Sequence, residues 1–219
     1  MPVITISRQF GALGLPVGRR LADRFGAEFL DRAIVAQVAV RSGIPESQLE
    51  TYDERLPSIW QRIASALGSG APDIGAPPSV EDEPPALSIH DRLVKLTRAV
   101  VEEAAAGGNA IIVGRGGAFI LAGKMGVLNV MLVASLEDRV RYLLARVDDA
   151  PGAERLDEPA LRNLCKTIDA ARAEYIRGTF GANWLDARNY DLVVDTGRLG
   201  VARTVELIET AVRTDGART

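Results

Sequence analysis

The segment that most constrains the fold is residues 4–22, which read ITISRQFGALGLPVGRRLA. A short β-branched stretch leads into a glycine-bearing turn, and an arginine-flanked helical pattern follows. This order is typical of the opening unit of an α/β nucleotide-binding domain. Backbone N–H groups of such a turn, together with the N-terminus of the next helix, bind anionic phosphate. The pattern G-x-x-x-x-G-K-[ST] is absent, so the segment predicts a phosphate site of unusual composition.

Apolar strands alternate with helical patterns along most of the chain. Strands are predicted at residues 3–6, 27–30, 109–113, 127–133 and 191–194. Helices are predicted at residues 16–25, 32–42, 87–106, 136–147, 160–177 and 201–212. The alternation predicts an α/β fold with a parallel sheet and right-handed crossovers.

Two stretches interrupt this alternation. Residues 45–67 have a weaker helical pattern, and residues 68–85 are dense in Gly, Pro, Ser and acidic side chains without periodicity, which is typical of a mobile loop. We expect one domain over residues 1–219, with a helical insert and mobile loop at about 45–86 and a lid region at about 148–180.

The composition excludes several classes of protein. A net charge of −3 does not favour binding to a nucleic acid polymer, and Cys165, the single cysteine, excludes an intrachain disulfide. No apolar run reaches about 18 residues, so we expect no membrane span. No signal-peptide pattern opens the chain, and we expect a cytoplasmic protein with small-molecule partners, either a monomer or a homodimer.

Candidate functional residues follow the predicted strands, because ligands of open α/β sheets bind beyond the carboxyl ends of the strands. In chain order they are Arg8, Gly11 and Gly14, then Asp31, then Gly114 and Arg115, then Ser135, Arg139 and Arg141, and finally Asp195 and Thr196. Arginines at several strand ends suit a polyphosphate, since the guanidinium fork matches phosphate oxygens.

Each candidate also has a purely structural interpretation. The glycines can serve tight turns alone, and the arginines can simply solvate the surface. Asp31 either contacts a sugar, a base or Mg²⁺, or caps the next helix. Asp169 and Arg172 are spaced i, i+3 and form a surface ion pair unless their helix belongs to a mobile lid. Arg115 lies between glycines, which favours close approach to a ligand.

Taken together, the motifs resemble cytidylate kinases, and more closely a divergent bacterial cytidylate kinase-like group whose opening reads I-T-I-S-R-Q-F-G-S-G-G. The resemblance covers nearly the whole chain apart from residues 45–85. Its elements are Ile4-Thr5-Ile6 with the glycine loop, Phe29-Leu30-Asp31, Ile111 to Gly116, Val133 to Arg139, Asp169-x-x-Arg172 and Tyr190 to Thr196.

The resemblance implies a three-layer P-loop fold with helical acceptor and lid insertions. It implies transfer of the γ-phosphoryl group of ATP, with Mg²⁺, to a nucleoside monophosphate such as CMP. By position, the cofactor-binding residues would be Arg8, Gln9, Phe10, Gly11, Ala12, Leu13, Gly14, Gly18 and Arg19. The substrate-binding residues would be Asp31, Gly114 and Arg115, and the catalytic residues Arg115, Arg139, Asp169 and Arg172. No metal ligand is assigned.

The chain departs from the family pattern at the turn itself. The usual lysine position is Gly14, and the usual Mg²⁺-binding hydroxyl falls near Leu15 or Pro16, which cannot ligate a metal. Leu13 carries a Cβ and disfavours the positive φ that glycine accepts. We hypothesise that Arg8 or Arg19 replaces the charge of the lysine.

These departures keep two other functions open. A degenerate member would bind a nucleotide or another phosphorylated ligand without catalysis, as a regulatory or interaction module. The third interpretation is a kinase of a non-nucleotide small molecule.

Overall fold

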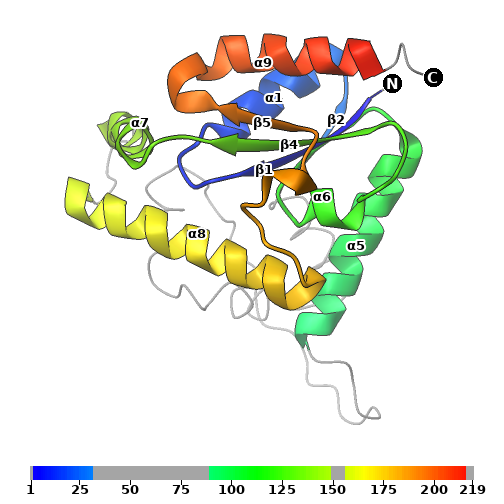
Figure 1. Cartoon of the computed structure of the whole chain (residues 1–219), viewed down its shortest axis with the longest axis horizontal. Coiled ribbons are helices and arrows are strands. Elements are labelled where there is room, and N and C mark those ends of the chain that lie inside the picture. Colours follow the sequence, from blue (N-terminus) through cyan, green and yellow to red (C-terminus); the bar gives the residue numbers. More distant parts are fainter. Residues whose placement is uncertain (1, 32–88, 149–155, 216–219) are drawn as a thin grey trace, which may run out of the picture.

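The computed structural model describes residues 2–31, 89–148 and 156–215 (Figure 1). The helix predicted at 32–42, the insert at 45–67 and the loop at 68–85 lie outside the described residues.

Five parallel strands form the sheet, in the order β2-β3-β1-β4-β5. They are β1 (Val3–Arg8), β2 (Glu28–Leu30), β3 (Ala110–Val113), β4 (Val127–Val133) and β5 (Leu192–Asp195). Strand β1 is central, and its Ile4 is in register with Ile111 of β3 and Leu128 of β4. The loops that follow β1, β3 and β4 therefore emerge side by side at one edge of the sheet.

Helices α1 (Gly14–Phe25) and α9 (Thr196–Asp215) cover one face of the sheet (Figure 1). Ile4 and Ile6 of β1 are buried there in one cluster with side chains from both helices, including Leu21 and Ile208. The conformation of Gly200, with φ 65°, kinks α9, so the helix predicted at 201–212 corresponds to the part beyond the kink.

Helices α5 (Ile89–Gly107), α6 (Gly117–Ile120) and α8 (Glu158–Phe180) lie on the opposite face (Figure 1). Val101 of α5 packs with Ile112 of β3, and Ile176 of α8 packs with Met131 of β4. The three layers confirm the predicted α/β architecture. The single turn α6 and the short 3₁₀ helix η1 (Ala187–Asn189) were not predicted from the sequence.

Helix α7 (Leu136–Asp148) and helix α8 form a pair at the carboxyl edge of the sheet, with a small hydrophobic core of their own. The Oγ of Ser135 accepts the N–H of Asp138 at 3.1 Å and so caps the start of α7. Asp157 caps α8 by accepting the N–H of Ala160 at 2.9 Å, so this helix begins two residues before the predicted start. None of the helices in the described ranges is long and apolar enough to cross a membrane.

Candidate functional site

The β1–α1 loop, residues 9–13, is anchored to neighbouring strand ends. Gln9 donates its N–H to the carbonyl of Leu132 at 3.0 Å, and its side-chain oxygen accepts the N–H of Ala134 at 3.1 Å. The hydroxyl of Thr196 donates to the carbonyl of Ala12 at 3.2 Å. The end of β4 and the start of α9 therefore fix the loop from two sides.

Two residues of this loop have left-handed backbones, Gly11 with φ 81° and Leu13 with φ 57°. Leu13 takes the positive φ that its Cβ was expected to disfavour. A non-glycine residue there costs about 1–2 kcal/mol. Its side chain packs against the core beneath α1, and this burial offsets the strain.

The loop leaves a group of backbone donors without internal partners. Among the described residues, the N–H groups of Gly11, Leu13, Gly14 and Leu15 meet no hydrogen-bond acceptor, and Leu13 makes no side-chain cap. These groups lie at the N-terminus of α1, where the helix dipole adds partial positive charge. Such a set of amides binds anions, above all phosphate.

The loop after β3, residues 114–116, lies next to the β1–α1 loop. Its three residues have successive φ angles of 81°, 57° and 69°, and the N–H of Gly114 donates to the carbonyl of Ile6 at 2.9 Å. The ring of Phe180 leaves no room for a side chain at Gly116, where a Cβ would lie 2.7 Å from a ring carbon. Within the described part of the chain, Arg115 makes no hydrogen bond or ion pair, although it is the strained residue of this loop. Uncompensated strain of this kind is typical of functional sites.

Arg8, the last residue of β1, reaches across both loops. A Cβ on Gly14 would lie 2.5 Å from its Cγ, and a Cβ on Gly114 would overlap its Nη1. The stem therefore crosses the start of α1, and the guanidinium rests on the backbone of Gly114.

Arg139 of α7 and Asp169 of α8 make hydrogen bonds with the backbone carbonyl and N–H of Phe10. The Nη1 of Arg139 lies 2.5 Å from the Oδ2 of Asp169 and donates to the carbonyl of Phe10 at 3.2 Å. The N–H of Phe10 donates to the Oδ1 of Asp169 at 2.8 Å. The Arg139 side chain is buried and the Asp169 side chain is mostly buried, with exposed fractions of 8% and 14%. The Phe10 ring packs against the α7–α8 core.

Arg172 holds Arg8, two residues before Phe10. Its Nη1 donates to the carbonyl of Arg8 at 2.8 Å, and its Cζ lies 5.9 Å from the centre of the Phe10 ring. The i, i+3 pair with Asp169 exists at 3.7 Å, but Asp169 is mostly buried and its closer partner is Arg139. In this structure, the three residues expected to be catalytic, Arg139, Asp169 and Arg172, hold the backbone of residues 8–10.

Cys165 lies in the α7–α8 core and is fully buried. Burial raises the pKa of its thiol, against the opposing effect of the nearby Arg139. A buried, protonated thiol is a poor nucleophile, so we assign Cys165 a packing role in this core.

Two of the expected site residues, Gly18 and Arg19, point away from these loops, and Asp31 lies at the carboxyl end of β2. Gly18 faces the core, where a Cβ would be 2.7 Å from the Cγ2 of Val113. The Arg19 guanidinium lies over the ring of Phe29, 5.9 Å from its centre. Asp31 follows β2 and is the last described residue before a gap. Of the two arginines considered as replacements for the lysine, Arg8 directly precedes the loop, whereas Arg19 lies in α1.

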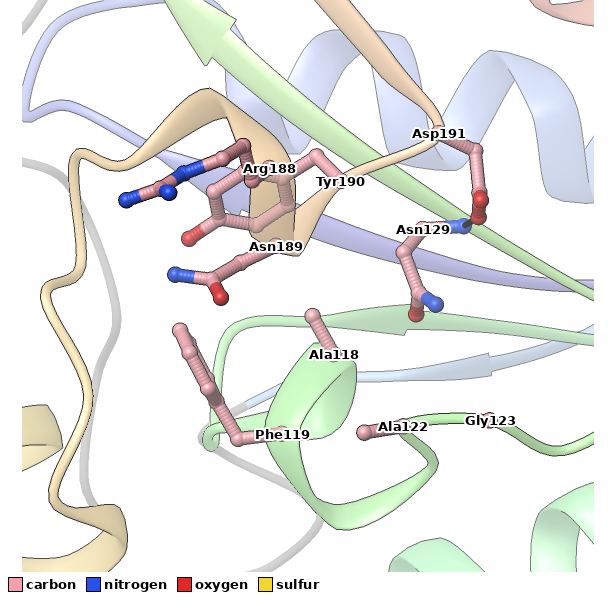
Figure 2. A pocket seen from close by; sticks show the side chains of 9 residues that line it. All are labelled: Ala118, Phe119, Ala122, Gly123, Asn129, Arg188, Asn189, Tyr190 and Asp191. Carbon is pink, nitrogen blue, oxygen red and sulfur yellow. Dashed lines mark hydrogen bonds between the residues drawn. The ribbon is translucent and has the colours of Figure 1, made fainter.

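A cavity of about 250 Å³ lies beside the amino-terminal half of β4, apart from these loops (Figure 2). Its polar groups make hydrogen bonds within the fold. The carboxylate of Asp191 accepts the N–H of Asn129 at 2.7 Å, and Asn189 donates to the carbonyl of Asn183 at 2.7 Å. We assign no ligand to this cavity.

The sheet order and the glycine loop after the central strand define an α/β P-loop fold. The chain belongs to the cytidylate kinase-like family, which it matches over residues 3–198. This membership supports phosphoryl transfer and nucleotide binding in general, and it implies ATP with Mg²⁺.

Solved structures that are similar to this chain include one whose TM-score is above 0.5, and that structure supports the fold. An uncharacterized protein from Eubacterium ventriosum is 17% identical, with a TM-score of 0.64, 97% of this chain and 99% of that chain covered. A shikimate kinase from Bacteroides thetaiotaomicron is 13% identical, with a TM-score of 0.48 and coverage of 97% and 98%.

A curated relative shares part of the sequence. A uronate isomerase of Corynebacterium glutamicum is 30% identical over 112 residues, which are 51% of this chain and 20% of that protein. The matched segment is therefore about a fifth of the length of that relative.

The residues present fit phosphate better than they fit a metal. The amides of the β1–α1 loop suit phosphate oxygens, whereas Leu15 and Pro16 offer Mg²⁺ no ligand. The described ranges contain no group of three or more His, Cys, Asp or Glu side chains that could hold a metal ion.

Proposed function

We propose that the protein transfers the γ-phosphoryl group of ATP to a nucleoside monophosphate, with a CMP-like acceptor. The observation that carries this proposal is the pairing of two loops at the carboxyl edge of the sheet. The β1–α1 loop offers unpartnered amides at a helix N-terminus, and the loop of residues 114–116 presents Arg115 from a strained backbone beside it. Family membership supports the same reaction.

Each group has a distinct task in this proposal. The amides of Gly11, Leu13, Gly14 and Leu15 bind the donor phosphates. Arg115 contacts the acceptor and the transferred group, with Gly114 allowing the close approach. Phosphoryl transfer needs alignment and positive charge more than covalent help from the protein. Mg²⁺ carried on the phosphates of ATP would neutralise part of their charge.

Arg139, Asp169 and Arg172 act as positioning residues in this proposal. They hold the backbone of residues 8–10, which fixes the amides that follow. Because ATP and nucleoside monophosphates are cytoplasmic metabolites, we place the reaction in the cytoplasm.

A specific observation favours the second candidate function, nucleotide binding without catalysis. Leu15 and Pro16 remove the hydroxyl that would hold Mg²⁺. A third candidate, a kinase of a non-nucleotide small molecule, depends on residues 45–85, which lie outside the described residues.

Calorimetric titration with ATP, with and without Mg²⁺, followed by an ADP-release assay on CMP, dCMP, UMP and AMP, tests the proposal. We expect micromolar binding of ATP and turnover with one monophosphate. Binding without turnover would support the non-catalytic module. A lack of binding would overturn the proposal and limit the family resemblance to ancestry and fold.

A further inference from the structure

The last residue of the central strand, Arg8, is a cation that lies beside the position of the missing lysine. We propose that Arg8 supplies the positive charge that a lysine at position 14 would otherwise supply, and that the Arg8 side chain excludes such a lysine. The inference rests on the proposed function, because it concerns the donor phosphates of the same site.

The Arg8 side chain occupies the space that a side chain at position 14 would need. A Cβ on Gly14 would lie 2.5 Å from the Cγ of Arg8 and 3.1 Å from both its Cβ and its Cδ. Separations under 3.0 Å are essentially never found for a real Cβ. The backbone of Gly14 is not left-handed, so its conformation does not call for glycine. Glycine is required at position 14 because the aliphatic part of the Arg8 side chain occupies the space of a Cβ there.

The guanidinium of Arg8 lies against the backbone of Gly114. A Cβ on Gly114 would overlap the Nη1 of Arg8 and lie 3.0 Å from its Cζ. The guanidinium is thus bounded by glycines of two loops, the β1–α1 loop and the loop after β3. This position is beside the unpartnered amides that suit phosphate. A planar guanidinium can bind two phosphate oxygens at once, which an ammonium group cannot do.

The backbone of Arg8 is fixed by its neighbours. Its backbone pairs with Leu132 of β4, and its carbonyl accepts a hydrogen bond from Arg172 at 2.8 Å. A cation rooted in the central strand loses less freedom on binding than one on a flexible loop. Arg19 does not compete for this task, because its guanidinium lies over the ring of Phe29.

The test separates charge from space. Arg8→Met keeps an unbranched stem and removes the charge, whereas Arg8→Ala removes both. Each is combined with Gly14→Lys, and Arg20→Ala, an exposed arginine on α1, is the matched control. Affinity for ATP is measured by calorimetry, and thermal unfolding reports whether each variant is folded.

We expect Arg8→Met and Arg8→Ala each to weaken ATP binding by roughly ten- to a hundred-fold, the usual effect of losing charge-assisted hydrogen bonds. Gly14→Lys alone weakens binding because the new side chain meets the Arg8 stem. In the Arg8→Ala background the same change restores most of the affinity. In the Arg8→Met background it does not, because the stem remains. Arg20→Ala leaves the affinity unchanged.

The outcomes distinguish the two proposals. A wild-type protein that binds no ATP overturns the proposed function and this inference together. A wild-type protein that binds ATP, with unchanged affinity in folded Arg8→Met, overturns this inference alone. If Arg8→Ala does not fold, Arg8→Met still decides the role of the charge. If Gly14→Lys is tolerated beside Arg8 without loss of affinity, the steric half of the inference is overturned.

Discussion

Asn109 at the amino end of the sheet and Leu13 and Arg115 at its carboxyl end share a left-handed backbone with φ 57°, yet their surroundings differ. The side chain of Asn109 donates to the carbonyls of Phe25 at 3.3 Å and Gly26 at 2.9 Å. Asparagine tolerates this conformation, and its hydrogen bonds tie two segments together. The strain at Asn109 therefore has a local structural reason.

At the carboxyl end, the strained residues make no such bonds. Packing of the Leu13 side chain against the core offsets its strain, but among the described residues the amides around Leu13 have no internal partners and Arg115 makes no hydrogen bond. A left-handed backbone at a non-glycine residue therefore indicates a functional site only when the hydrogen bonds and packing of that residue are considered as well. Strain that the fold uses locally is structural, and strain without such use indicates a ligand.

The largest expected effect comes from the buried ion pair that fixes the β1–α1 loop. Asp169→Asn keeps an acceptor for the N–H of Phe10 but leaves Arg139 buried without a counter-charge. Breaking a buried pair in this way costs about 3–5 kcal/mol of the free energy of unfolding. Urea denaturation measures it, and we expect ATP affinity to fall as the loop loses its support.

The matched control for this variant is Glu137→Gln, which removes an exposed ion pair with Arg162 on the same two helices. Exposed pairs contribute little, so we expect almost no change in stability. Equal losses in the two variants would contradict a special role for the buried pair.

A pair of glycines tests the comparison between the two ends directly. Gly114 at the carboxyl end has φ 81°, and Gly123 at the amino end has φ 73°. A Cβ on Gly123 has nothing within 4 Å, whereas one on Gly114 overlaps Arg8. Gly123→Ala should cost only the left-handed strain, about 1–2 kcal/mol. Gly114→Ala adds displacement of the Arg8 guanidinium.

We expect both variants to unfold at lower temperature, and only Gly114→Ala to lose affinity for ATP. Differential scanning calorimetry and titration calorimetry measure the two effects separately. Loss of ATP affinity in Gly123→Ala would show that the amino end also shapes the site, and the contrast between the ends would fail.

The sequence predicted the sheet and the location of the glycine-bearing β1–α1 loop, because both depend on local patterns. Alternation of apolar strands with helices identified all five strands to within two residues at their ends. Helix α6 is a single turn, too short to show a 3.6-residue period, and was missed for that reason. Asp157 and Pro159 are start signals for α8, but they stand in an acidic, Pro-containing stretch that resembles a loop.

The roles of individual side chains were harder to predict. Arg139 and Asp169 lie thirty residues apart and meet only because α7 packs on α8. Gly18 follows the motif closely, yet its task is close packing against Val113, which only the tertiary structure reveals. For the same reason, sequence alone left Arg8 and Arg19 as equal candidates to replace the lysine.

The smallest expected effect is a change in the pKa of a carboxylate next to Arg188, which lines the cavity beside the amino-terminal half of β4 (Figure 2). A hydrogen bond from the side chain of Arg188, followed by one from its backbone N–H, lowers the pKa of Asp186 from 3.8 to about 2. A carboxylate whose pKa is lowered by folding stabilises the protein above pH 3.8, and this contribution is lost as the pH falls towards 2.

Arg188→Gln removes the side-chain bond and keeps the backbone bond, so we expect the pKa of Asp186 to lie between these values. NMR titration of the carboxyl carbons measures it, and the Glu137 resonance, whose pKa is lowered mainly by a backbone hydrogen bond at the start of α7, serves as the internal reference. ATP affinity should not change, because Arg188 lies at the opposite end of the sheet from the β1–α1 loop. A change in ATP affinity would mean that the cavity and the loops form one site, and the comparison between the two ends would need to be replaced by a single extended binding surface.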